Sequence, residues 1–160
     1  MAHDGQDLAF HLDNSWMIVD LLTKTRRAAD ELSTLLETAR QQMRAQIVVD
    51  GKTSGKLLEE NQDAVHGLAW LATYATAMEQ MQNWAEKLHS DGEFGEIEQL
   101  LHQIGTSEYH AQVLGGIPMS QGEIVRLSDI GISEAAIDKY QSAEVVELSN
   151  KGNSQDARMR

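Results

Sequence analysis

The stretch IVDLLTKTRRAADELSTLLETARQQM, residues 18–43, decides the fold class. Its apolar residues recur at spacings of three and four, which places them on one side of an α-helix. The charged residues between them fall largely on the opposite side. We therefore predict one long amphipathic helix, which begins after a cap at Asn14 or Ser15. It should end near Val48, because Val49-Asp50-Gly51 signals a turn.

Two further long helices follow in the sequence. Ser54 is a candidate cap for a helix that runs to Ser90 and carries apolar residues on two sides, which is typical of a central helix. A third helix is expected from Phe94 to Leu114, where Gly115-Gly116 can end it. We expect Gly105 to mark a bend or a close contact with another helix. The apolar face predicted for this third helix consists of Phe94, Ile97, Leu100, Leu101, Ile104, Ala111 and Leu114.

Shorter helices are expected in the last quarter of the chain, over residues 120–127, 133–140 and 142–149. The first is predicted from Ser120-x-x-Glu123, which matches a capping box. The predicted fold is therefore all-α: an antiparallel bundle of three long helices, with short C-terminal helices across one end. We divide the chain into a flexible N-terminus (1–13), a helical bundle domain (14–149) and a linker or truncated end (150–160), whose one candidate core residue is Met159.

Composition limits the classes of function. The 160 residues include 25 acidic and 13 basic side chains, a formal charge of −12, which disfavours nucleic-acid binding. The chain has no cysteine, so disulfides and zinc–thiolate sites are excluded. The sequence shows neither a signal-peptide pattern nor an apolar run long enough for a membrane span. We expect a cytoplasmic protein.

Motifs for catalysis or metal binding are not found. The chain does not carry Glu-x-x-His on two helices, as a di-iron bundle requires, and it has no His-Glu-x-x-His motif. We interpret Glu98 and His102 as an exposed pair. His66 is interpreted as a hydrogen-bonded, half-buried side chain. Nucleophile-elbow, dinucleotide-binding and Walker patterns are absent as well. We therefore assign no catalytic, cofactor-binding or metal-binding residue.

Aromatic and sulfur-containing side chains gather in the second predicted helix. Such residues at helical spacing usually fill a core, but they also form docking surfaces. Because this helix carries more apolar surface than two neighbours can cover, both interpretations stay open. The interface candidates are Trp70, Tyr74, Met81 and Trp84.

Four segments carry a resemblance to a known family: 64–74 (AVHGLAWLATY), 94–98 (FGEIE), 115–123 (GGIPMSQGE) and 152–158 (GNSQDAR). They resemble the N-terminal extension of methylsuccinyl-CoA dehydrogenases, flavoenzymes of the acyl-CoA dehydrogenase superfamily, over residues 30–160. The resemblance implies a parent enzyme that oxidises methylsuccinyl-CoA to mesaconyl-CoA with FAD. It places the flavin and the catalytic glutamate in a core outside this segment, so we expect no cofactor here.

One element of the superfamily has a partial match. A Gln-x-x-Gly-Gly element followed by Glu lies near the flavin in core acyl-CoA dehydrogenases, and Gln112, Gly115 and Gly116 fit it. However, Glu123 falls one residue late and Ile117-Pro118 replaces the aromatic residue. No flavin or base role is transferred to these residues.

Three hypotheses about function follow. The first is a non-catalytic helical domain that packs against an acyl-CoA dehydrogenase core or a neighbouring subunit, in a homo-oligomer. The second is an autonomous enzyme, or a small acyl-CoA or flavin binding module, that uses a pocket near Gly115-Gly116 and His66. The third is a free-standing helical adaptor that dimerises through its apolar face.

Overall fold

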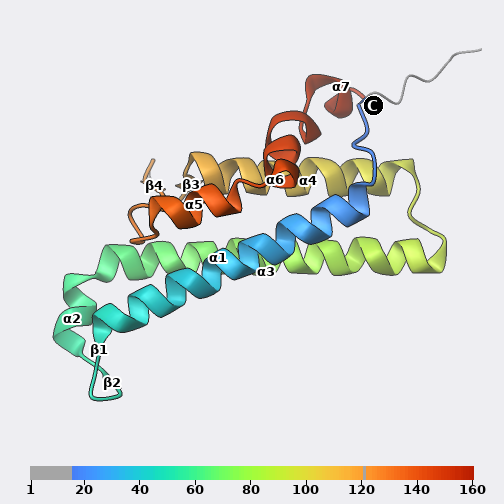
Figure 1. The fold of residues 1–160 in the computed structure, drawn as a ribbon. Coiled ribbons are helices and arrows are strands. Elements are labelled where there is room, and N and C mark those ends of the chain that lie inside the picture. The colour runs from blue at the N-terminus through green and yellow to red at the C-terminus, as the bar shows by residue number, and fades with distance from the viewer. Residues whose placement is uncertain (1–15, 121) are drawn as a thin grey trace, which may run out of the picture.

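The computed structural model describes residues 16–120 and 122–160. Three long helices form its body: α1 (Leu21–Ile47), α3 (Gln62–Asp91) and α4 (Glu96–Gly115) (Figure 1). Helix α3 contacts both α1 and α4, as predicted for the central helix, and α4 lies within two residues of its predicted range. The all-α class is confirmed, since the described strands form only two short hairpins.

The predicted start of the first helix is wrong. The predicted caps and the range 1–13 lie outside the described residues. Helix α1 begins at Leu21. The residue before it, Asp20, has a left-handed backbone (φ 57°), and its side chain does not cap the helix. Gln103 of α4 binds the turn before α1. Its Oε1 accepts from the Ile18 N–H (2.7 Å), and its Nε2 donates to the Trp16 carbonyl (2.9 Å). This buried side chain satisfies backbone groups that a longer helix would have satisfied internally.

The second predicted helix is divided in two. The Ser54 cap is confirmed, because its hydroxyl accepts from the Leu57 N–H, and α2 (Gly55–Glu60) follows. The chain bends at Asn61, whose side-chain amide donates to the Leu57 carbonyl (2.8 Å), and α3 begins one residue later. Before α2, strands β1 (Val48–Val49) and β2 (Lys52–Thr53) flank the predicted turn. Asp50 and Gly51 both have positive φ there, as a tight hairpin turn requires.

The helix predicted over residues 120–127 is wrong. Strands β3 (Ile117–Pro118) and β4 (Ile124–Val125) form an antiparallel hairpin instead. The capping box does not form. The Glu123 carbonyl accepts from the Met119 N–H, and the Glu123 N–H donates to the Ser120 carbonyl. Gly122 has a φ of 81°, which favours this turn.

The β3–β4 hairpin packs against α3 at Gly67, a position without a side chain. A Cβ on Gly67 would lie 2.5 Å from Cγ2 of Val125 and 3.1 Å from Cγ1 of Ile130. Val125 is 5% exposed and belongs to the main core cluster. The glycine therefore allows the hairpin to bury Val125 against α3.

The C-terminal part contains α5 (Glu134–Tyr140), α6 (Ala143–Glu147), a π-helical turn η1 (Leu148–Gly152) and α7 (Gln155–Arg158). Serine hydroxyls cap α5, α6 and α7. These elements do not gather at one end, because α5 and α6 contact α1, whereas η1 and α7 lie on α4 (Figure 1). The expectation for Met159 is wrong: it is 76% exposed, and Ala157 is buried with Trp16 and Leu100.

Ion pairs tie α1 to its neighbours. Arg26 donates to Glu79 and Glu86 of α3, and these contacts raise its pKa further and lower the pKa of Glu86. Lys24 and Arg27 pair with acids of α6. Over the described residues, no helix combines the length and apolarity needed to cross a bilayer.

Candidate functional site

Helix α4 has an unusual distribution of polarity. Its N-terminal half exposes Ile97 (67%) and Leu101 (60%) to solvent, although both were predicted to lie on its buried face. Its wholly buried polar residues are His102, Gln103, Thr106, Ser107 and His110. A surface helix normally shows the reverse arrangement. The outward side of α4 is therefore a candidate contact surface.

His102 is the centre of the buried polar layer, so its interpretation as part of an exposed pair with Glu98 is wrong. Gln82 uses its amide N–H groups on a carbonyl of α1 and on Glu86, so its Oε1 accepts from Nε2 of His102 (3.1 Å). The Thr25 hydroxyl donates to a carbonyl of its own helix and accepts from the same Nε2 (2.9 Å). This pattern assigns the ring proton to Nε2 and joins α1, α3 and α4.

Both buried histidines of α4 are neutral. Burial lowers the pKa of His102 and of His110 to about 4. Among the described residues, neither Nδ1 of His102 nor Nε2 of His110 has a hydrogen-bond partner, so a second ring proton would stay unsatisfied. Nδ1 of His110 contacts the Tyr140 hydroxyl, whose pKa burial raises. No solvent-exposed surface reaches these rings, and they hold helices together rather than meet a substrate.

The packing of Met81 against Gly105 sets how α3 and α4 lie side by side. Met81 of α3 is half-buried, and its Cε would lie 2.5 Å from a Cβ on Gly105 of α4, which confirms the close helix contact expected at Gly105. The two helices are antiparallel (Figure 1). Trp84 follows Met81 on α3, and Leu101 precedes Gly105 on α4, so both lie in the same direction along the helices from the contact between Met81 and Gly105. We define the outer face as Met81, Trp84, Leu88, Ile97 and Leu101.

The four interface candidates from the sequence lie at different depths. Tyr74 is 8% exposed; its hydroxyl donates to Gln112 and its ring packs edge-on against Tyr109. Trp70 is half-buried against the core, and its indole N–H donates to His66 (3.1 Å). Trp84 is 41% exposed. Two candidates, Met81 and Trp84, therefore belong to the outer face.

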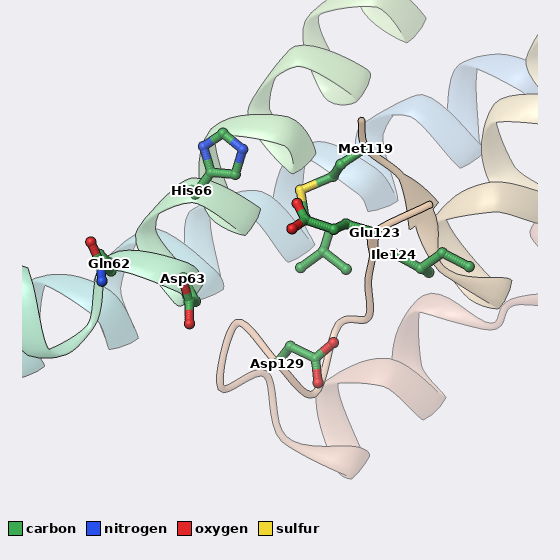
Figure 2. A pocket seen from close by; sticks show the side chains of 8 residues that line it. Gln62, Asp63, His66, Met119, Glu123, Ile124 and Asp129 are labelled. Carbon is green, nitrogen blue, oxygen red and sulfur yellow. The ribbon is translucent and has the colours of Figure 1, made fainter. Parts of the chain in front are cut away.

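An open pocket lies between the start of α3 and the β3–β4 hairpin, with a volume of about 750 Å³. Figure 2 shows Asp63 and His66 on α3, Glu123 on the hairpin and Asp129 on the loop that follows it. The other lining residues are Gln62, Met119, Ile124 and Val125. His66 is hydrogen-bonded as predicted, but it is exposed rather than half-buried.

The pocket does not fit a flavin or an acyl-CoA. Its lining residues include three carboxylates and no lysine or arginine, so it would repel the phosphates of either molecule. Gly115 and Gly116 do not line it. Gly116 instead packs against Ile124, whose Cγ2 would lie 2.4 Å from a Cβ there. In the described part of the chain, no three histidine or acidic side chains gather closely enough to hold a metal ion.

Gln112, which matches part of the superfamily's flavin-proximal element, also has structural contacts. It accepts from the Tyr74 hydroxyl and donates to Glu108 (2.8 Å). That carboxylate binds Asn153 as well, and the two hydrogen bonds lower the pKa of Glu108. Gln112 therefore links α3, α4 and the C-terminal segment.

Comparison with known proteins bears on the resemblance. No protein-family model matches the chain. It is 45% identical over 144 residues to (2S)-methylsuccinyl-CoA dehydrogenase of Cereibacter sphaeroides. The resemblance to that enzyme is confirmed. The match covers 90% of this chain and 26% of the relative, so the chain spans about a quarter of the relative's length.

Sequence reasoning missed the polarity of α4, although a signal was present. The buried polar residues at 102, 103, 106, 107 and 110 share one side of a helix, just as an apolar stripe would. Counting apolar residues alone assigned Ile97 and Leu101 to the core. The periodicity of the uncharged polar residues predicts the opposite orientation.

Proposed function

We propose that this chain is a non-catalytic helical domain of a flavin-dependent acyl-CoA dehydrogenase of the methylsuccinyl-CoA type. Its role is to dock through the outer face onto the catalytic part of the enzyme or onto a neighbouring subunit. The observation that carries this proposal is the inverted polarity of α4, which leaves Ile97 and Leu101 in solvent, while Trp84 of the adjoining helix α3 is exposed as well. The similarity to about a quarter of a dehydrogenase supports an enzyme of that type as the parent of this domain.

The size of the outer face suits docking within one assembly. Full burial of a large apolar side chain contributes about 1.5–3 kcal/mol. Ile97, Leu101 and Trp84 are 67%, 60% and 41% exposed, so covering them contributes roughly 1–2 kcal/mol each. A gain of a few kcal/mol is weak for two free proteins but sufficient for domains held at high effective concentration.

The pocket beside the β3–β4 hairpin and the two buried histidines of α4 also support a non-catalytic role. The pocket between α3 and the β3–β4 hairpin is lined by carboxylates that would oppose a CoA or flavin phosphate. The histidines with strongly lowered pKa are buried within the helix bundle and have no exposed surface. Neither feature offers a place where substrate, base and electron acceptor could meet.

A chimera tests the proposal directly. The matching segment of the Cereibacter sphaeroides enzyme is replaced by this chain, and dehydrogenase activity, flavin content and oligomeric state are measured. Because the chain has no cysteine, Leu101→Cys introduces a single thiol whose labelling by a maleimide can be located by peptide mass spectrometry. The matched control is Ser33→Cys, at an exposed position on α1.

Docking predicts that Leu101→Cys labels about tenfold more slowly in the chimera than in the isolated chain, while Ser33→Cys labels equally in both. Trp84→Ala should restore labelling and weaken assembly, whereas Thr76→Ala, an exposed position elsewhere on α3, should change neither. An inactive chimera, or equal labelling of Leu101→Cys in both contexts, contradicts the proposal. A free-standing adaptor would instead protect Leu101→Cys in the isolated chain as protein concentration rises.

A further inference from the structure

Three acids lie at one end of the outer face without basic partners. Glu93 precedes α4, and Glu96 and Glu98 occupy its first turn, on either side of the exposed Ile97. No ion pair among the described residues includes any of them. Several acids elsewhere are paired, for example Glu86 with Arg26 and Glu147 with Lys24.

The opposite end of the same surface is electrostatically satisfied. Glu108, three turns further along α4, accepts hydrogen bonds from Gln112 and Asn153. Lys87, which follows Trp84 on α3, lies instead toward the N-terminus of α4, where it is already paired with Asp91 (2.6 Å). The charge at the edge of the outer face is therefore negative and concentrated at the N-terminus of α4.

We infer, on the basis of the proposed function, that the surface which covers the outer face is an apolar groove edged by lysine or arginine side chains that meet Glu96 and Glu98. The partner is the catalytic remainder of a dehydrogenase like the relative, about three-quarters of which lies outside the match. Charge complementarity fixes the direction of docking, because the bases must lie at the N-terminal end of α4.

A second copy of this chain is a poor occupant. Each copy carries a formal charge of −12, so self-association opposes charge with charge. The described bases nearest the outer face are already paired, and the exposed Arg40 and Arg44 lie on the other half of the molecule, toward the end of α1. An isologous contact through the outer face therefore brings no free base to Glu96 or Glu98.

First-turn acids also favour their own helix through its dipole, and the experiment must separate this local effect from docking. Glu96→Gln/Glu98→Gln is introduced into the chimera that carries Leu101→Cys, and into the isolated chain. The matched control is Glu59→Gln/Glu60→Gln on α2, which changes net charge equally at a distant, exposed position. Labelling of Leu101→Cys reports docking, and thermal unfolding of the isolated chain reports the helix effect.

We expect the α4 double variant to lose about fivefold in protection of Leu101→Cys, and the α2 control to lose none. Raising salt from ~0.01 M to ~1 M shortens the screening length from ~30 Å to ~3 Å, so it should lower protection in the parent chimera and not in the α4 variant. Protection that is unchanged by the α4 substitutions and by salt overturns the inference but leaves docking intact. No protection in the parent chimera refutes the proposed function itself.

Discussion

Lowering the pH from 7 to 5 should destabilise this protein through its two buried histidines. The pKa of His102 and of His110 is about 4 in the folded chain because of burial, against about 6.5 in an unfolded chain. A depressed histidine pKa means that the unfolded state binds more protons between these two values. Stability is therefore fully present above pH 6.5 and falls as the pH drops toward 4.

The size of the loss follows from the two pKa values. At pH 5 the unfolded histidine is almost fully protonated and the folded one almost neutral, so each contributes a loss of about 2 kcal/mol. Together the two remove roughly 4 kcal/mol, a large fraction of the 5–15 kcal/mol typical of a domain. Carboxylates with lowered pKa, such as Glu86 and Glu144, add losses mainly below pH 4.5.

Urea unfolding followed by circular dichroism at pH 7 and pH 5 measures this loss. His102→Gln removes one titrating group while keeping a side chain that can donate to Gln82, so it should halve the pH dependence even if it lowers stability at pH 7. His66→Gln, at an exposed position, is the matched control and should leave the dependence unchanged. If the free energy of unfolding is the same at both pH values, or if His102→Gln keeps the full dependence, the reasoning is refuted.

Three further predictions concern stability. Gly152→Ala should cost about 1–3 kcal/mol in urea unfolding, because its Cβ would lie 1.7 Å from Oγ of Ser107; combining it with Ser107→Gly should recover part of that loss. Ser142→Ala should lower the melting temperature and cost about 1 kcal/mol, since the hydroxyl caps α6 and also binds Glu31. Gly67→Ala should displace the β3–β4 hairpin, and hydrogen exchange should then accelerate at Val125 while α1 keeps its protection.

The sequence was sufficient for the long helices because each has a redundant signal. The apolar stripe of α1 contains Ala28, Leu32 and Ala39, which are wholly buried, so an error at one position would not change the prediction. Ser54 and Ser133 cap the helices that they were expected to begin. Both the apolar stripe and the serine caps are local signals, because each depends on residues only a few positions apart in the sequence.

The failures arose where a distant residue decides the local conformation. The start of α1 depends on Gln103, 85 residues away from Ile18, and no pattern near Ile18 records that hydrogen bond. The hairpin at 117–125 depends on the missing side chain of Gly67, which opens a place for Val125 on α3. A capping box was a reasonable local prediction, but burial of Val125 outweighed it.

The two unusual sides of α4 have a common energetic explanation. Its inward side is held by hydrogen bonds to neighbouring segments, which contribute about 1 kcal/mol each on balance, and by apolar residues such as Leu100 and Val113. Its outward side carries the apolar area that would normally drive a helix onto its neighbours. The polar layer gives α4 a unique position, because buried groups such as His102 accept only one set of partners. A helix whose position is fixed by polar contacts can present an apolar surface outward without collapsing inward, and a docking helix needs that property.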